Sequence, residues 1–293
     1  MQVAFIGLGA MGYPMAAHVL SGKHSVTVYN RTGSTAHRWL DEKTNNHPDA
    51  SIADTPVLAA KNADVVLMCV GNDDDVRSVV YGDKGVLSGM KRGAILIDHT
   101  TTSAELAIEL GKACADKGLR FLDAPVSGGQ AGAENGKLTV MLGGEQSIYE
   151  QVIPILDCYA QKHALMGGVG KGQLTKMVNQ ICIAGLVQGL SEALHFATQA
   201  GLDIRQVVDV ISKGAAQSWQ MENRAHTMVK NEFDFGFAVD WMRKDLDIVL
   251  NEAKRNKSTL PVTALVDQFY AQVQANGGGR FDTSSLITLL NKH

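Results

Sequence analysis

Three glycines near the N-terminus have the spacing of a turn that can bind a diphosphate. Gly7, Gly9 and Gly12 follow the β-branched run Val3–Ile6 and open a segment of helical composition. The first glycine permits a tight turn, the second lets the backbone approach a pyrophosphate, and the third allows the helix to pack closely on the strand. The N-terminus of that helix would face the phosphates with unpaired N–H groups. A strand before and a helix after favour a dinucleotide site over an ordinary glycine-rich turn. Its residues would be Gly7, Leu8, Gly9, Ala10, Met11 and Gly12.

The segment after the second expected strand indicates which dinucleotide binds. NAD-binding units place an acidic residue there to hold the ribose 2′-hydroxyl. This chain has Asn30, Arg31 and Thr32 instead. Arg31 can pair with a 2′-phosphate through a forked, charge-assisted contact, and Asn30 and Thr32 can donate further hydrogen bonds. We therefore expect NADP to be preferred, with NAD as the second candidate. A solvated arginine at a strand end is the competing explanation.

A run of small residues in the middle of the chain could hold a carboxylate. In Val126-Ser127-Gly128-Gly129 the small side chains let backbone N–H groups converge, and the Ser127 hydroxyl can join them. The run follows a strand at the carboxyl end of the expected sheet, where ligands gather. It therefore predicts, as an alternative to a plain loop, that Ser127, Gly128 and Gly129 orient an anionic substrate.

Lys176 and Asn179 are the polar pair that could act on such a substrate. They are three residues apart in a helical segment and so share a face. Oxidation of an alcohol by hydride removal needs a group that takes the hydroxyl proton. A lysine can do this if burial and nearby positive charge lower its pKa toward neutrality. Lys176 lies in a weakly charged segment, and a lysine that snorkels to solvent is the alternative.

Strands and helices must alternate in the first half of the chain to position these residues. This alternation predicts a parallel sheet wound on both faces. The expected strands are Val3–Ile6, Ser25–Tyr29, Val65–Cys69, Ala94–Ile97, Leu119–Leu122 and Leu138–Leu142. The expected helices are Met11–Leu20, Ala36–Lys43, Thr55–Ala60, Ser103–Ala115 and Glu145–Leu156.

The second half is expected to be helical, because strand signals stop after about Gly172. Val178–Ala200 carries one charge, Glu192, and predicts a long helix that joins the two halves. Asp203 and Asp282 are expected to cap later helices, Ile204–Ile211 and one ending at Leu290, with an amphipathic run, Asp240–Ala253, between them. The predicted fold class is an α/β, Rossmann-type doubly wound sheet followed by an all-α C-terminal domain. The predicted domains are 1–163, which binds the dinucleotide, and 164–293, for substrate binding and oligomerisation.

The composition excludes several classes of function. With 45% hydrophobic and 19% charged residues, the 293-residue chain can build real cores in two domains. A net charge of −3 argues against nucleic acid or an anionic membrane as the main partner. The longest purely apolar stretch, Ile181–Val187, is too short to span a bilayer. The four cysteines lack metal-site spacing and are expected to be buried thiols, so no metal is predicted. Without a leader-like segment before the first strand, the expected location is the cytoplasm.

Four motifs in one order resemble those of a known family. They are Gly7–Gly12 with Met15-Ala16, Asp123-Ala124-Pro125-Val126-Ser127-Gly128-Gly129, Gly168-Val169-Gly170-Lys171-Gly172 with Lys176 and Asn179, and Lys244-Asp245-Leu246. Together they resemble the β-hydroxyacid dehydrogenases, which include 3-hydroxyisobutyrate dehydrogenases and semialdehyde reductases. The resemblance covers essentially the whole chain.

The resemblance implies a role for each matched residue. Lys176 would be the general acid/base and Asn179 would position the substrate. Lys244 would lie near the cofactor, where its charge would also help to keep Lys176 deprotonated, and Val70 and Thr101 would line the cofactor. The chain departs from the family pattern at two places: Gln180 stands where a second asparagine is common, and Lys137 where threonine is common. His99 has no nucleophile to pair with and is interpreted as structural.

The expected activity is interconversion of a small 3-hydroxy acid, or a related ω-hydroxy acid, with its semialdehyde. An imine reductase on the same architecture is one alternative, although such enzymes usually replace the lysine at position 176. A catalytically silent NADP-binding interaction protein is the other, and the presence of Lys176 argues against it. The partners expected are a small carboxylate-bearing substrate and a second copy of the chain, in a homodimer or homotetramer. Pocket shape decides among the possible hydroxy acids, and spacing does not encode it.

Overall fold

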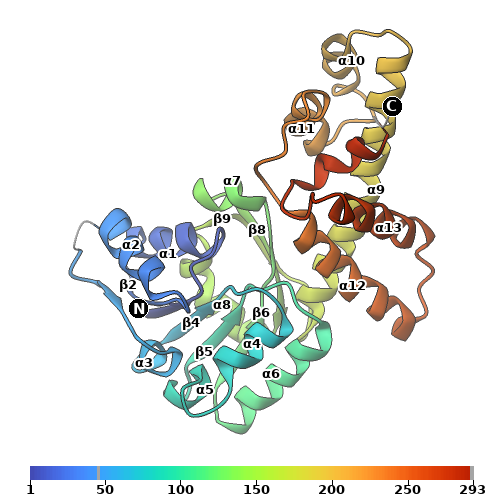
Figure 1. Cartoon of the computed structure of the whole chain (residues 1–293). Coiled ribbons are helices and arrows are strands. Elements are labelled where there is room, and N and C mark those ends of the chain that lie inside the picture. The colour runs from blue at the N-terminus through green and yellow to red at the C-terminus, as the bar shows by residue number, and fades with distance from the viewer. Residues whose placement is uncertain (45–46, 291–293) are drawn as a thin grey trace. The chain divides into compact units, whose positions relative to one another are not determined.

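The computed structural model describes residues 1–44 and 47–290. The chain divides into two compact units, Met1–Lys176 and Met177–His293. Figure 1 shows the sheet with its helices in the first unit and helices throughout the second.

The sheet of the first unit has the strand order of a dinucleotide-binding fold. In the described residues the strands are β1 (Gln2–Ile6), β2 (Ser25–Tyr29), β3 (Ala50–Ile52), β4 (Val65–Met68), β5 (Ile95–Asp98), β6 (Arg120–Asp123), β7 (Val126–Ser127), β8 (Leu138–Gly144) and β9 (Ala160–Leu165). Their order is β3-β2-β1-β4-β5-β6-β8-β7, with β9 paired to β8. The pairs from β3 to β6 are parallel, whereas β8 runs antiparallel to β6 and β7. The order reverses direction between β1 and β4, which is where such sheets bind their ligands.

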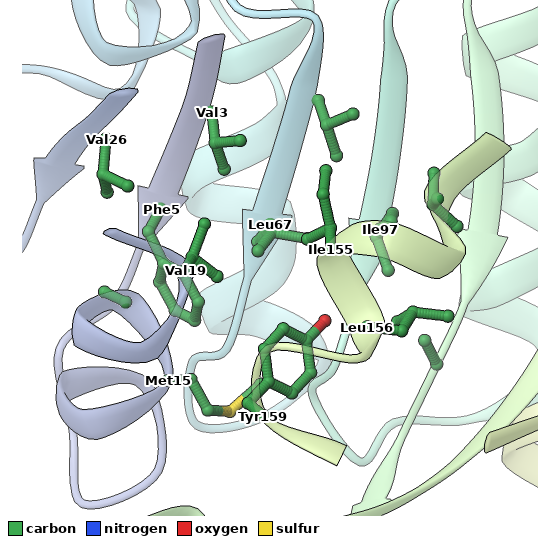
Figure 2. Close-up of a cluster of buried hydrophobic side chains, with 14 of the residues drawn as sticks. Val3, Phe5, Met15, Val19, Val26, Leu67, Ile97, Ile155, Leu156 and Tyr159 are labelled. Carbon is green, nitrogen blue, oxygen red and sulfur yellow. The ribbon is translucent and has the colours of Figure 1, made fainter. Parts of the chain in front are cut away.

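Helices cover both faces of this sheet. They are α1 (Gly12–Ser21), α2 (Gly33–Thr44), α3 (Pro56–Ala60), α4 (Asp73–Val80), α5 (Val86–Gly89), α6 (Ala104–Asp116), α7 (Gly129–Glu134) and α8 (Gln146–Leu156). Val3 and Phe5 of β1 pack with α1, α2 and α8, and Figure 2 shows part of this cluster around Tyr159. Ala4 and Ile6 point to the other face and pack with α3 to α6. Because both faces of these strands are covered, Val3–Ile6 of β1, all of β4 and Ile95–Ile97 of β5 are continuous apolar runs.

The second unit is built around the long helix α9 (Lys171–Gln199), which begins in the first unit. It also contains α10 (Ile204–Ile211), α11 (Trp219–Val229), α12 (Val239–Asn256), α13 (Pro261–Ala275) and the 3₁₀ helix η1 (Thr283–Leu289). One core cluster joins α9 to α12, α13 and η1, and a second joins it to α10 and α11. Asp203 and Asp282 cap α10 and η1 with their carboxylates, as expected from the sequence.

The predicted fold class is confirmed, and several details differ. The strands β3, β7 and β9 and the helices α4, α5, α7, α11 and α13 were not expected. The helix α9 starts at Lys171 rather than Val178. The last helix is a 3₁₀ helix.

Two expectations about apolar residues need correction. Only Cys114 is a buried thiol; Cys69 and Cys158 are partly exposed and Cys182 is exposed. The second correction concerns membrane spans. Among the described residues, the whole of α9 is long and apolar enough to cross a membrane by length and composition, although its apolar stretch Ile181–Val187 is too short by itself. A core helix of a globular unit gives the same pattern, and α9 supplies both cores of the second unit.

Candidate active site

The glycine turn has the geometry that the sequence predicts. Gly7 has φ +95°, and an added Cβ would overlap the Cys69 carbonyl oxygen. At Gly12 an added Cβ would overlap the Gly7 carbonyl oxygen and lie 2.9 Å from the Phe5 ring, so α1 packs flush against its own strand. Gly9, in contrast, has no atom within 4 Å of that position. No side chain caps the N-terminus of α1 at Met11. The turn therefore presents open backbone beside uncapped N–H groups, which fits a dinucleotide diphosphate.

Asn30 supports the turn from the end of β2. Its Oδ1 accepts a hydrogen bond from the Leu8 N–H at 2.9 Å, and its Nδ2 donates to the Thr32 carbonyl at 3.1 Å. The amide thus holds the two loops together through one of its two N–H donors. The Arg31 guanidinium is 84% exposed and forms an ion pair with Asp75, with Nη1 and Oδ1 3.1 Å apart.

The loop after β5 lies next to the end of β4. Thr100 Oγ1 accepts from the Val70 N–H at 3.1 Å, and the Thr100 N–H donates to Asp98 Oδ1 at 2.9 Å. His99 is buried, its Nδ1 lies 2.7 Å from the Ala124 carbonyl, and its Nε2 lies 2.9 Å from the Tyr159 hydroxyl. Burial lowers the pKa of His99 to about 4, so the ring is neutral and holds two strands together. Val70 and Thr101 therefore belong to two hydrogen-bonded loops at the carboxyl edge of the sheet.

Asp123, at the end of β6, anchors the start of α9. Its Oδ1 accepts from the Gly170 N–H at 2.7 Å, and its Oδ2 accepts from the Gln173 N–H at 2.9 Å. The carboxylate thus caps a helix far from it in sequence, as a helix N-terminus requires. Burial raises the pKa of Asp123 to about 6, although these backbone donors oppose the rise.

Gln173 ties the same helix turn to the loop after β5. Its Nε2 donates to the Thr100 carbonyl at 2.7 Å, and its Oε1 accepts from the Thr102 N–H at 3.1 Å. Lys176 follows three residues later on α9 and is 7% exposed. Asp123 and Gln173 therefore set the position of the helix segment that carries Lys176. The sequence analysis did not single them out; Asp123 opens the quoted Asp-Ala-Pro-Val-Ser-Gly-Gly motif, which is the signal that could have found it.

Close backbone contact leaves no room for side chains where α9 meets the sheet. An added Cβ at Gly172 would overlap the Met141 carbonyl of β8 and lie 2.7 Å from Asp123 Oδ2. An added Cβ at Gly143 would overlap Asp123 Oδ1 and lie 2.8 Å from the Gly172 nitrogen. Both glycines are therefore required for the helix to begin at this edge.

Ser127 lies on β7, the strand paired with β8, where it stands opposite Thr139. Gly128 and Gly129 follow with φ +130° and +61°, and the space beside Gly129 is open. Backbone N–H groups in a glycine turn of this kind can bind an anion. β6, β8 and β7 are neighbours in the sheet, so this segment belongs to the same edge as Asp123.

In the second unit, Asn179 and Lys244 are joined by a chain of polar contacts. The Asn179 Nδ2 donates to Gln180 Oε1 at 2.8 Å, and Gln180 Nε2 donates to Asp245 Oδ2 at 2.6 Å. Lys244 Nζ lies 3.0 Å from Asp245 Oδ1. Gln180 and Asp245 are both 2% exposed, so this is a buried network rather than a solvated helix face. Gln180, the departure from the family pattern, thus links the two residues that the sequence singled out.

Within residues 1–44 and 47–290, no cluster of three or more histidine, cysteine or acidic side chains could hold a metal.

Asp98 provides a pH-dependence test for this edge of the sheet. Burial raises the pKa of Asp98 from 3.8 to about 7. The folded protein therefore holds a proton that the unfolded chain has lost, so Asp98 stabilises the fold fully below pH 4 and not at all above pH 7. Between pH 5 and pH 8 this loss amounts to roughly 3 kcal/mol. Asp98→Asn should remove this pH dependence. Relative to the wild type, the free energy of unfolding of the variant should therefore rise by roughly 3 kcal/mol between pH 5 and pH 8, as measured by urea unfolding. The exposed Asp116→Asn is the control, and equal pH dependence in Asp98→Asn and the wild type would contradict the assignment.

The sheet order and the glycine turn define a Rossmann-type dinucleotide-binding unit. Residues 2–168 match the family described as the NAD binding domain of 6-phosphogluconate dehydrogenase. Residues 170–290 match the family described as NAD-binding of NADP-dependent 3-hydroxyisobutyrate dehydrogenase.

Individual proteins are similar to this chain over nearly its full length. An oxidoreductase of Shewanella frigidimarina (strain NCIMB 400) is 60% identical over 291 residues, covering 99% of this chain and 98% of that protein. The 2-hydroxy-3-oxopropionate reductase of Escherichia coli (strain K12) is 32% identical over 290 residues, covering 99% and 97%. The solved structure of Mycobacterium tuberculosis 3-hydroxyisobutyrate dehydrogenase with L-serine has a TM-score of 0.88 and 27% identity, covering 100% of both chains. The chain belongs to the β-hydroxyacid dehydrogenase family, whose members are NAD(P)-dependent oxidoreductases.

Proposed function

We propose that this enzyme interconverts a small 3-hydroxy acid, or a related ω-hydroxy acid, and its semialdehyde, with NADP(H) and with Lys176 as general acid/base. The observation that carries this proposal is the position of Lys176: a buried lysine on the turn of α9 that Asp123 and Gln173 fix beside the loop after β5. Two similar proteins are named for substrates of this class, 2-hydroxy-3-oxopropionate and 3-hydroxyisobutyrate.

Each candidate residue has a defined part in the proposed reaction. When bound, a nicotinamide would supply the hydride acceptor for oxidation of the alcohol carbon and the hydride donor for reduction of the aldehyde carbon. Lys176 Nζ takes the hydroxyl proton during oxidation and gives a proton to the carbonyl oxygen during reduction. Ser127 and the N–H groups of Gly128 and Gly129 bind the carboxylate, and Asn179 orients the reacting oxygen. Val70, Thr101 and Lys244 would contact the bound cofactor.

The preference for NADP rests on Arg31. It is the charged residue at the end of β2, where an acidic side chain would repel a 2′-phosphate. Arginine suits a phosphate because its planar guanidinium can donate two parallel hydrogen bonds.

A spectrophotometric screen tests the function directly. Short hydroxy acids and their semialdehydes are offered with NADP(H) and NAD(H), and absorbance of the reduced nicotinamide is followed. We expect turnover only for short compounds that carry both a carboxylate and a hydroxyl or aldehyde group, so that both groups can bind in the same site. Turnover of cyclic imines with no turnover of any hydroxy acid would refute the proposal.

We also propose that the protein self-associates, as a homodimer or homotetramer, in the cytoplasm. Phe196 and Val210 in the second unit are 71% and 73% exposed, and Leu202 is 51% exposed. Large exposed apolar side chains can contribute to protein–protein contacts. Sedimentation velocity at micromolar concentration should show a species larger than 31.4 kDa, and Phe196→Glu should shift it toward the monomer. A wild-type monomer would contradict this.

A further inference from the structure

We propose that Asp75 limits the preference of this enzyme for NADP by competing with the 2′-phosphate for Arg31. The inference rests on the proposed NADP-dependent function. It concerns an ion pair that the sequence analysis did not anticipate, between residues 44 positions apart.

The position of this ion pair follows from the order of the strands. β1 lies between β2 and β4, and its C-terminal end carries the glycine turn. Arg31 comes directly after β2, and Asp75 lies in the first turn of α4, the helix after β4. The contact between them therefore joins the loop after β2 to the first turn of α4, on the two sides of the end of β1, where the adenosine half of a dinucleotide binds.

One partner of the pair is fixed and the other can move. The Asp75 N–H donates to the side chain of Asn72, which caps α4, and the Asp75 carbonyl accepts from Ser78 Oγ. The Asp75 side chain is 30% exposed, whereas that of Arg31 is 84% exposed. Exposed ion pairs contribute little to stability, so a ligand can displace this one readily. The guanidinium can therefore leave Asp75 for a bound phosphate.

Asp75 then acts differently on the two cofactors. A 2′-phosphate held by Arg31 carries about −1.5 to −2 charges and would lie close to the Asp75 carboxylate, which repels it and competes for the same donors. NAD has a neutral hydroxyl at this position, so the Asp75 carboxylate neither repels it nor competes with a phosphate for Arg31. At ordinary ionic strength we expect the carboxylate to weaken NADP binding by about five-fold and NAD binding by less than about two-fold.

The neighbouring acids of α4 face other partners. Asp73 accepts hydrogen bonds from the Ser103 N–H and hydroxyl, at 3.1 and 2.5 Å. Asp74 is 97% exposed and lies 3.7 Å from Arg77. Asp74→Asn therefore removes the same charge from the same helix turn without touching Arg31, which makes it a matched control.

The test measures the Kd values of NADPH and NADH for the full-length wild type, Asp75→Asn and Asp74→Asn by fluorescence titration. Asp75→Asn should lower the Kd of NADPH about five-fold and leave that of NADH within about two-fold, and the effect should shrink as salt rises. Asp74→Asn should change the NADPH/NADH ratio by less than about two-fold. Thermal unfolding checks that all three proteins are folded.

The outcomes separate this inference from the function on which it rests. If the wild type binds neither nucleotide, the proposed function fails. If it binds both and the two variants shift the ratio equally, or Asp75→Asn weakens NADPH binding, the role of Asp75 is rejected while the dehydrogenase proposal stands.

Discussion

Replacement of Lys176 by alanine should lower kcat by roughly 10²- to 10⁴-fold, the usual contribution of a positioned general acid/base. The lysine is 7% exposed on the anchored turn of α9, so bulk water has little access to its side chain. The dinucleotide turn at Gly7–Gly12 is built by other elements. The Kd of NADPH should therefore stay within about two-fold of the wild-type value, and the loss should appear in the chemical step.

Two further measurements make this prediction specific. Lys171→Ala removes a lysine from the exposed first position of the same helix and should leave kcat nearly unchanged. Small primary amines added to Lys176→Ala should restore part of the rate, with an effect that rises as more of the amine is deprotonated. Residual kcat above about a tenth of the wild-type value would remove Lys176 from the mechanism.

Asp123→Ala should be the most damaging change outside the reacting groups. It leaves the buried N–H groups of Gly170 and Gln173 without their carboxylate acceptor. Each unsatisfied buried donor costs about 1–3 kcal/mol, and relief from burying the carboxylate itself offsets part of this. We expect a net loss of about 3 kcal/mol in the free energy of unfolding, measured by urea denaturation, and a fall in kcat because the turn before Lys176 loosens.

Asp123→Asn separates anchoring from general stability. Its amide can accept from one of the two N–H groups but not from both. The variant should therefore recover part of the stability and part of kcat, whereas Asp116→Ala on the exposed end of α6 should change neither. Asp123→Ala with wild-type stability and kcat would show that the start of α9 does not depend on this carboxylate.

The sequence predicted the features that depend on local pattern. The alternation of apolar runs gave the main strands, and Asp203 and Asp282 were identified as caps because a cap acts within three residues. β3 and β9 were missed because β3 has three partly exposed residues and β9 reads Ala-Gln-Lys-His-Ala-Leu, with little apolar alternation. α9 was started too late because its first turn contains glycine and lysine and is capped by Asp123, 47 positions earlier.

Long-range partners could not be predicted from periodicity. Gln173 meets Thr100 across 73 positions, and Gln180 meets Asp245 across 65. Such pairs form because strand order and helix packing bring distant segments together. The spacing of residues within one segment predicts neither the strand order nor the helix packing. The roles of Lys176, Asn179, Ser127 and Arg31 and the domain limits 1–163 and 164–293 stay predictions.

The flush contact between Gly143 and Gly172 restricts how this enzyme can diversify. Even one methyl group at either position would push the helix off the sheet, so mutation cannot sample new side chains there. A change of substrate preference would therefore have to arise from residues elsewhere in the candidate site. Directed-evolution libraries should accordingly leave these two codons unchanged.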